Sequence, residues 1–429
     1  MKEQMKLRRS RLQGSVSAPS SKSYTHRAII CSSLADGKSQ IRNYLDCKDT
    51  RETINACSSF GATIKEIDHS LEISGTKPKA PPNPIELTGS ATCYRFILPI
   101  AGLAKGKTVI QRSERLRERP IDELISVLSE IGVRCEFHNG RIEVVGRGYL
   151  PGGTIRIKGD ISSQYISGLL IASPLARNDT EIRVVTRLES KPYVEITLDV
   201  LNSFGITVNH SEDLRKFSIP KNQHYKPIDY EIEGDFSSAA FLLAAGAING
   251  KIEVRNLNMN SKQGDREILR IIEHMGARVE RMQRGVMVES SDLDGIRIDA
   301  RDIPDLVPIC AVLGCFADGE TRIDNAGRLR IKESDRLSAI TQELRKMNAD
   351  IEESGNSLII NGKCKLKGAV IDPHNDHRIA MSCAIAALSA EGETIIDNAE
   401  CVEKSYPNFF TDLGKLGAKI YLKNNRVLI

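Results

Sequence analysis

The chain has 429 residues, of which 40% are hydrophobic and 27% charged, and its formal net charge is +4. This length exceeds a usual single-core domain, and the composition excludes a disordered chain and a polybasic nucleic-acid-binding arm. With 5% aromatic residues and no tryptophan, the chain offers few platforms for base stacking, so nucleic acid is not an expected partner.

Neither a membrane segment nor a secretion signal is expected. The longest apolar runs, such as 306–317, are shorter than the roughly 20 residues of a membrane helix, and the first residues MKEQMKLRRSR lack an apolar core. The ten cysteines occur singly, and several, such as Cys310 and Cys383, lie in apolar runs where a free thiol packs as a small hydrophobic group. We therefore expect a cytoplasmic protein with reduced cysteines and no membrane contact.

The predicted elements begin with a strand over residues 1–13, which stands outside the repeats. After it the chain repeats itself six times with a period of about 70 residues. Each repeat opens with an apolar segment rich in small residues, which predicts a helix buried on all sides, followed by a short β-branched strand. These segments start 68 to 75 residues apart, at Ser20, Ser90, Ser162, Ser237, Asp305 and Asp376.

The second half of each repeat predicts an amphipathic helix that ends near a Gly or Asn and is followed by two strands. Each unit of about 70 residues is therefore a βαβαββ module, and the fold class is α/β. The six segments that carry this second half are 54–73, 124–144, 196–219, 269–288, 340–360 and 409–429.

Six modules of this size suit two domains of three modules each. One crossing between the domains is expected near 229–234. The other is expected near 14–20, because we expect the strand over 1–13 to pair with the C-terminal domain. The expected domains are a discontinuous one, residues 1–13 with 230–429 and repeats 4–6, and an inserted one, residues 14–229 with repeats 1–3.

The starts of the apolar helices carry residues that suit anions. Ser or Asp at a helix start caps free backbone N–H groups. Lys and Arg close to a helix N-terminus are locally unfavourable, which makes sense if a phosphate binds between them. We expect these cations to converge between the domains, a usual place for ligands. They are Lys22, Arg27, Arg95 and Arg378 at helix starts and Arg115, Arg117, Arg119, Lys191, Lys332, Arg336 and Lys404 in loops.

Two carboxylates, Asp305 and Glu333, interrupt this basic set. Structural ion pairs and a positioned acid and base are both open interpretations.

Two other patterns predict no site. GLAKGKT at 102–108 departs from a Walker A loop in spacing and follows an apolar helix, and HNDH at 374–377 has no other His or Cys at ligand spacing. Neither a nucleotide nor a metal is expected.

Eight motifs together resemble a known family. They are SAPSSKSYTHRA, LRERPI, GDISSQ, SKPY, DIPD, RIKESDR, NDHR and KSYPNFF, in this order over the whole chain. The chain resembles the EPSP synthases, which are enolpyruvyl transferases. The resemblance implies two domains of three βαβαββ repeats each, an inverse α/β barrel-like fold with a double crossover, and an active site in the cleft between the domains. It also implies a monomer that uses neither metal nor cofactor.

The resemblance implies a reaction of the shikimate pathway, on the route to chorismate and the aromatic amino acids. The enolpyruvyl group of phosphoenolpyruvate passes to the 5-hydroxyl of shikimate 3-phosphate, and phosphate is released. Carried over motif by motif, shikimate 3-phosphate would be bound by Lys22, Ser23, Arg27, Ser162, Ser163, Gln164, Ser190, Tyr193, Asp305 and Lys332. Phosphoenolpyruvate would be bound by Lys22, Arg119, Gln164, Arg336, Arg378 and Lys404.

The same resemblance implies the catalytic groups. Asp305 would accept the proton of the 5-hydroxyl, and Glu333 would donate to the methylene carbon, with Lys22 near enough to share proton transfer. The chain departs from the family at two positions. Ala91 stands where the family has a glycine against phosphoenolpyruvate, and Arg328 stands where some members have an asparagine.

Two alternative functions fit parts of the sequence. One is the sister enzyme that transfers enolpyruvyl to UDP-N-acetylglucosamine. Its usual reactive cysteine is missing from QRSERLRERP at 111–120. The other is a non-catalytic anion-binding repeat protein, which would tend to avoid Asp305 and Glu333 because they repel anions.

Overall fold

The structure is a computed structural model that describes residues 4–422. The chain divides into two compact units: unit 1 joins the residues up to Pro19 with those from Gly234 onward, and unit 2 is Ser20–Glu233. The two boundaries, 19/20 and 233/234, lie within the ranges 14–20 and 229–234 given above for the crossings. Each unit has a hydrophobic core of its own. No helix in the described part of the chain is long and apolar enough to cross a membrane.

Unit 2 contains three four-stranded sheets, in the strand orders β14-β3-β5-β4, β6-β7-β9-β8 and β10-β11-β13-β12. In each sheet the first pair is parallel and the other two pairs are antiparallel. The strands are β3 (Lys38–Arg42), β4 (Thr63–Ile67), β5 (Ser70–Ser74), β6 (Ile85–Leu87), β7 (Lys105–Arg112), β8 (Arg134–His138), β9 (Arg141–Arg147), β10 (Gly153–Ile157), β11 (Thr180–Val184), β12 (Asn209–His210), β13 (Lys216–Ile219) and β14 (Asp229–Glu231).

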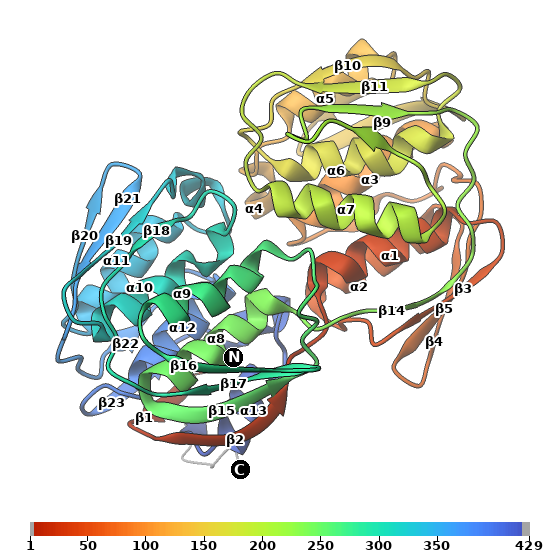
Figure 1. The fold of residues 1–429 in the computed structure, drawn as a ribbon. Helices are drawn as coiled ribbons and strands as arrows, with labels where there is room; N and C mark the ends of the chain where they lie inside the picture. Colours follow the sequence, from red (N-terminus) through yellow and green to blue (C-terminus); the bar gives the residue numbers. More distant parts are fainter. Residues whose placement is uncertain (1–3, 423–429) are drawn as a thin grey trace. The chain divides into compact units, whose positions relative to one another are not determined.

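The helices of unit 2 pack against these sheets, and α6 lies next to both α3 and α7 (Figure 1). Gly168 on α6 explains part of this close packing, because a Cβ there would lie 2.8 Å from the carbonyl oxygen of Arg95 on α3. The helices are α1 (Lys22–Leu34), α2 (Lys48–Ser59), α3 (Ala91–Leu103), α4 (Glu114–Arg117), α5 (Asp122–Glu130), α6 (Ser163–Ala172), the 3₁₀ turn η1 (Ser173–Leu175) and α7 (Lys191–Ser203).

Unit 1 repeats the same plan, with sheets in the orders β16-β17-β15-β2, β18-β19-β21-β20 and β22-β23-β1-β24. The expected six-fold α/β repeat is therefore confirmed. Its strands are β1 (Met5–Arg8), β2 (Leu12–Ser17), β15 (Gly250–Arg255), β16 (Arg278–Met282), β17 (Gly285–Glu289), β18 (Arg297–Asp299), β19 (Glu320–Asp324), β20 (Asp350–Ser354), β21 (Ser357–Asn361), β22 (Val370–Ile371), β23 (Glu393–Ile396) and β24 (Lys419–Leu422).

The apolar helices of unit 1 are buried almost completely, since small side chains let them pack on all sides. Its helices and 3₁₀ turns are α8 (Phe236–Asn249), η2 (Gly264–Glu267), α9 (Ile268–His274), η3 (Pro304–Leu306), α10 (Val307–Phe316), η4 (Gly327–Ile331), α11 (Arg336–Lys346), α12 (His377–Ala387), η5 (Ala399–Lys404) and α13 (Phe409–Lys415).

Three strands complete sheets whose other members lie far away in sequence. β1 lies between β23 and β24 and is antiparallel to both. β2 pairs parallel with β15, and β14 pairs parallel with β3. The strand expected over residues 1–13 is thus two strands, β1 and the start of β2. The last strand expected from the segment 409–429 extends beyond 422 and lies outside the described residues.

Three helix starts differ from the expectation. The N-cap of α1 is Ser21 rather than Ser20, and its side chain makes no capping hydrogen bond. The cap of α8 is Asp235, whose side chain accepts from Ser238 N, so Ser237 lies inside the helix. Asp305 caps no helix and lies in the turn η3, with its carboxylate directed at three cations. By contrast, Ser90, Ser162 and Asp376 do cap their helices.

Candidate active site

Arg336, the first residue of α11, is the centre of a buried cluster of charges in unit 1. Its guanidinium is 1% exposed and donates to Asp376 from Nε (2.8 Å), to Asp305 from Nη1 (2.8 Å) and to Glu333 from Nη2 (2.7 Å). Burial alone would lower the pKa of Arg336, but the carboxylates of Asp376, Glu333 and Asp305 outweigh it and raise the pKa above its ordinary value. Arg336 therefore stays charged and holds three carboxylates in fixed positions.

The Asp305 carboxylate forms ion pairs with three cations. Besides Arg336, Arg378 Nη2 donates to Asp305 Oδ2 at 2.9 Å, and Lys332 Nζ lies 3.6 Å from Oδ1. Burial raises the pKa of Asp305, but the charges of Arg378, Lys332 and Arg336 lower it by more. The pKa therefore lies well below its ordinary value. The structure thus presents Asp305 as an ionised carboxylate, the form that can accept a proton.

Glu333 and Lys332 stand next to each other in the loop between η4 and α11. Lys404 Nζ at the end of η5 lies 3.6 Å from Glu333 Oε1. Burial lowers the pKa of Lys332 to about 8, and the nearby Arg336 and Arg328 act in the same direction. A lysine with this pKa gives up its charge far more readily than an exposed lysine, which makes its anion binding depend on pH.

The cluster contains more positive than negative charge. It is made of the carboxylates Asp305, Glu333 and Asp376 and the cations Lys332, Arg336, Arg378 and Lys404. Three negative charges against four positive ones hold each side chain in place and leave an excess that attracts anions. This ion-pair arrangement explains how carboxylates can lie within a basic set.

Three buried acids lie near the predicted residues, and the sequence indicated one of them, Asp376, only as a helix cap. Asp376, 0% exposed, accepts from Arg336 and from Ser334 Oγ (3.1 Å) while also capping α12. Asp265 accepts from the Ser237 hydroxyl, and burial together with the charge of Asp305 raises its pKa to about 7. Asp49 of unit 2 pairs with Lys22 at 2.9 Å. The sequence contexts of Asp265 and Asp49 carry no signal that separates them from surface acids.

In unit 2, Arg27 positions two other predicted residues. Its guanidinium is 1% exposed and donates to the carbonyl oxygens of Ser23 (2.8 Å) and Tyr193 (2.9 Å) and to the hydroxyl of Thr197 (2.7 Å). Burial lowers the pKa of Arg27 to about 10. Arg27 therefore ties α1 to the start of α7, where Ser190 adopts a left-handed backbone (φ 55°). These bonds use much of its donor capacity inside the protein.

Arg95 joins the starts of α3 and α6. Its Nη1 donates to Gln164 Oε1 (2.7 Å) and to Ser162 Oγ (3.3 Å), and its Nη2 donates to the carbonyl oxygen of Pro120 (3.0 Å). The Gln164 amide then donates to Thr92 Oγ1 (2.7 Å). Arg95 thus places the SSQ motif at 162–164 against the loop that carries Arg119. The sequence indicated Arg95 only as a cation at a helix start, and it gave no prediction for Thr92.

Ala91 is the first residue of α3 and is 7% exposed. The turn before it is fixed by Glu52, whose carboxylate accepts from the backbone N–H groups of Thr88 (2.9 Å), Gly89 (2.9 Å) and Ser90 (3.0 Å). A Cβ at Gly89 would meet only a Glu52 oxygen at 4.0 Å, so this glycine relieves no crowding. The methyl group of Ala91 is therefore held by a rigid turn.

The predicted residues fall into separate sets. Direct contacts connect one set in unit 1: Asp305, Lys332, Glu333, Arg336, Arg378 and Lys404. In unit 2, Ser23, Arg27 and Tyr193 form one group and Ser162 and Gln164 another, and Lys22 pairs with Asp49. Ser163 is buried in the first turn of α6, and Arg119 is partly exposed.

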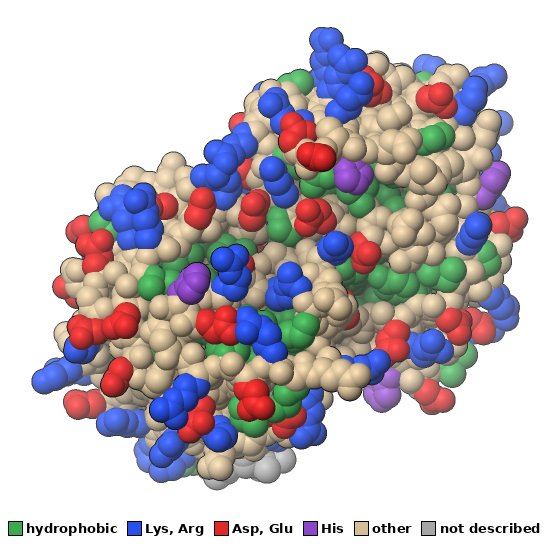
Figure 2. Space-filling model, in the orientation of Figure 1, with side chains coloured by type: hydrophobic (Ala, Val, Ile, Leu, Met, Phe, Trp, Pro, Cys, Tyr) green, Lys and Arg blue, Asp and Glu red, His purple; other side chains and the backbone are tan. Residues whose placement is uncertain are grey.

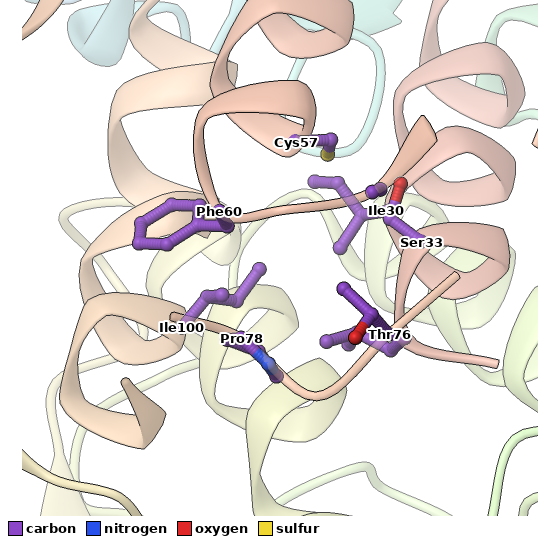
Figure 3. A pocket seen from close by; sticks show the side chains of 9 residues that line it. Ile30, Ser33, Cys57, Phe60, Thr76, Pro78 and Ile100 are labelled. Atoms are coloured by element: carbon purple, nitrogen blue, oxygen red, sulfur yellow. The ribbon is translucent and has the colours of Figure 1, made fainter. Parts of the chain in front are cut away.

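Other concave features suit these anions less well. Figure 3 shows a cavity in unit 2 around which Ile30, Phe60 and Ile100 lie, and none of its nine lining residues carries a formal charge. A second hollow contains Asp46, Glu66 and Asp68 and would repel anions. On the face drawn in Figure 2, basic and acidic side chains are interspersed. No group of three or more potential metal ligands occurs among residues 4–422.

Comparisons with known proteins agree over almost the whole chain. The profile of the EPSP synthase (3-phosphoshikimate 1-carboxyvinyltransferase) family matches residues 7–413. A 3-phosphoshikimate 1-carboxyvinyltransferase of Methanocaldococcus jannaschii is 45% identical over 96% of this chain and 98% of its own length. One from Clostridium perfringens is 42% identical over 95% and 97%.

Solved structures show the same fold. An EPSP synthase from Acinetobacter baumannii superposes with a TM-score of 0.84 at 25% identity, covering 98% of this chain and 100% of that one. The enolpyruvyl transferase NikO from Streptomyces tendae, at 18% identity, superposes with a TM-score of 0.83 over 98% and 99%. The second likeness concerns the fold alone.

Proposed function

The chain belongs to the EPSP synthase (3-phosphoshikimate 1-carboxyvinyltransferase) family, and from this premise we propose how it performs the reaction. The protein is a transferase that passes the enolpyruvyl group of phosphoenolpyruvate to the 5-hydroxyl of shikimate 3-phosphate and releases phosphate. The observation that carries the proposed mechanism is the Arg336 cluster, in which family-motif cations surround two carboxylates. The sister transfer to a UDP-sugar is not favoured.

The first proposed step is binding of two anions. Lys332, Arg378 and Lys404 offer positive charge around Asp305 and Glu333. Hydroxyl and amide groups of Ser23, Ser162, Ser163, Gln164, Ser190 and Tyr193 of unit 2, with Lys22 and Arg119, are proposed to bind the same substrates. Residues of both units are thus proposed to serve one reaction. Arg27 and Arg336, which donate mainly to protein groups, are proposed to position these contacts.

The second proposed step is addition, in which a proton moves to the methylene carbon of phosphoenolpyruvate while the 5-hydroxyl loses one. Asp305 is assigned the hydroxyl proton because its low pKa keeps it ionised. Glu333 is assigned the carbon proton, which its carboxylate first has to take up because it is paired with Arg336 and Lys404 in the free protein, with Lys22 close to the proton transfer in the family pattern. Elimination then removes a proton from the methyl carbon and expels phosphate. The Lys and Arg charges stabilise the developing anions.

The test is phosphate release from phosphoenolpyruvate in excess chelator. Release is expected to persist in chelator, because the proposal uses side-chain cations in place of a metal. It is also expected to require shikimate 3-phosphate, which accepts the enolpyruvyl group. Release without shikimate 3-phosphate, or activity that returns only with a divalent ion, would contradict it.

We also propose that the protein works as a monomer in the cytoplasm. Sedimentation at working concentration, giving one species of 47.4 kDa, tests the first point.

A further inference from the structure

Two cysteines of unit 1 lie against each other away from the charged cluster. Cys315 is in the last turn of α10, and Cys364 follows β21. The backbone N–H of Cys364 donates to the carbonyl oxygen of Cys315 at 2.8 Å, and that of Lys363 donates to Ala317 at 2.8 Å. The chain after β21 therefore runs alongside the end of α10.

This geometry permits a disulfide without a large backbone movement. Standard bond lengths and the 2.8 Å hydrogen bond limit the distance between the two Cα atoms to about 6.7 Å, within the range of about 4.4–6.8 Å that disulfides occupy. The interaction between the two thiols also raises the pKa of Cys315 and lowers that of Cys364, in keeping with this proximity. The pair thus has the proximity that cross-linking requires.

Cys364 has the surroundings of a reactive thiol. It is partly exposed, whereas Cys315 is fully buried. Its sulfur accepts from the backbone N–H of Asp350 at 3.4 Å and, as a thiol, donates to the carbonyl oxygen of Asn361 at 3.1 Å. Donation from the Cys315 thiol and from Asp350 N lowers the pKa of Cys364 to about 6, against the effects of burial and of the Asp350 carboxylate.

The other cysteines lack this combination. Of the ten, only Cys135 and Cys364 are partly exposed, and the remaining eight are buried. Burial raises the pKa of Cys135 to about 11, so at neutral pH it is almost entirely a thiol, which reacts far more slowly than a thiolate. Cys135 is therefore a control of matched exposure within the same chain.

We propose that Cys364 and Cys315 form a redox pair that a hydroperoxide converts into a disulfide, with Cys364 as the attacking and Cys315 as the resolving thiol. The Cys364 thiolate attacks hydrogen peroxide, an S–O bond forms, the O–O bond breaks, and the hydroxide that leaves takes a proton to become water. The Cys315 sulfur then attacks Cys364, the S–S bond forms, and the S–O bond breaks. The Cys315 proton and the departing hydroxide leave as a second water.

The cross-link would enclose the catalytic loop. Residues 315–364 include η4 and the start of α11, and with them Lys332, Glu333 and Arg336. A disulfide around such a loop restricts the unfolded chain, so we expect the oxidised protein to unfold at a higher temperature than the reduced protein. Thiol reductants should reverse both the bond and this shift.

The test is peptide mapping after a short exposure of the full-length protein to dilute hydrogen peroxide, with free thiols then alkylated. We expect one linked Cys315–Cys364 peptide pair, two hydrogens lighter than the reduced pair and absent after dithiothreitol. Cys135→Ser should leave the link unchanged. Cys315→Ser should instead leave Cys364 as a sulfenic acid that dimedone traps. A sulfenic acid on Cys135 before Cys364, or no linked pair in the folded protein, would overturn the proposal.

A second readout does not need oxidation. Iodoacetamide at pH 7 should alkylate Cys364 at least about tenfold faster than Cys135, because alkylation follows the thiolate. Equal rates at the two positions would overturn the assignment of Cys364 as the nucleophile. Cys364→Ser should retain phosphate release, since Cys364 contacts none of the charged residues of the cluster. A loss of activity in this variant would show that the cysteine pair is not independent of the active site.

Discussion

The Arg336 guanidinium donates to carboxylates from three places in the sequence: Asp305, Glu333 and Asp376. Removing Arg336 would leave these acids buried without their main partner, which typically costs about 3–5 kcal/mol. A loss of activity in such a variant could therefore reflect unfolding. Substitutions at the edge of the cluster distinguish an effect on the reaction from an effect on stability more clearly, and Lys332 is the first residue to test.

Lys332 should make substrate capture depend on pH. Its pKa of about 8 means that the free protein loses this positive charge as the pH rises through 8. We expect kcat/KM for shikimate 3-phosphate to fall up to about tenfold per pH unit above that point. Lys332→Arg keeps its charge and should remove the decline. The same pH profile in parent and variant would show that another group titrates.

Asp305 and Glu333 can be tested as proton-transfer groups. Asp305→Asn or Glu333→Gln should bind both substrates while turnover falls by roughly 100-fold or more, the scale of a positioned acid or base. Asp318→Asn is the control, because Asp318 is exposed and pairs only with the exposed Lys363. Steady-state phosphate release gives turnover and calorimetry gives binding. Turnover within a few-fold of the parent in both variants would leave these acids as ion-pair partners only.

Ala91 bears on inhibition by glyphosate, which occupies the phosphoenolpyruvate site in the family that the chain resembles. Its methyl group, where the family has glycine, should crowd this longer molecule more than the substrate. Overpacking costs about 1–3 kcal/mol, and each 1.4 kcal/mol is about tenfold in affinity. We expect Ala91→Gly to lower the glyphosate inhibition constant by about tenfold or more. The Gly89→Ala variant, whose Cβ would meet only a Glu52 oxygen at 4.0 Å, should leave that constant unchanged.

At the scale of elements, helix type and order follow from the sequence, but the partners that orient the helices do not. The small-residue pattern predicted α3 and α6 as buried helices, and both are. The contact that aligns them joins Arg95 on α3 to Gln164 and Gly168 on α6, and Arg95 and Gln164 are 69 residues apart along the chain. The start of α8 was misjudged for a local reason, because Asp235 competes successfully with Ser237 as the cap.

Gly168→Ala tests the approach of α6 to α3. Helix propensity alone would favour alanine by about 1 kcal/mol. The new Cβ, however, would lie 2.8 Å from the carbonyl oxygen of Arg95, and backbone cannot move aside cheaply. We expect a net loss of about 1–3 kcal/mol in the free energy of unfolding, with weaker substrate binding as Gln164 shifts. Denaturant unfolding measures this loss. A stabilised variant would show that the helices separate easily.

At the scale of the whole molecule, the repeat predicted six modules, and residues 4–422 form six four-stranded sheets. The period could not show which strand completes which sheet. β14 joins the sheet of the first module, and β1 enters the sheet of the last one, because hydrogen bonding across a sheet leaves no trace in local periodicity. The role of Asp376 in the cluster could not be predicted for the same reason, since its partner Arg336 lies 40 residues away in the sequence.

The central position of β1 makes unit 1 depend on a few N-terminal residues. Leu7 is 0% exposed within the core of unit 1. Leu7→Asp should cost more than about 3 kcal/mol, because it removes apolar burial and buries a charge. Hydrogen exchange should show β23 and β24 losing protection while the strands of unit 2 keep theirs. Arg9→Ala, at an exposed position, is the control. Unchanged exchange in Leu7→Asp would refute this dependence.

The place of β1 and β2 also imposes an order on biosynthesis. The ribosome releases these strands first, yet their partners β15, β23 and β24 begin at residues 250, 393 and 419. At about 5–20 residues per second, the first strands wait for tens of seconds. Unit 2 can meanwhile be completed as soon as β14 emerges. The nascent chain thus carries unpaired, apolar strand residues ahead of a folded unit, and this interval is when a chaperone would find most to bind.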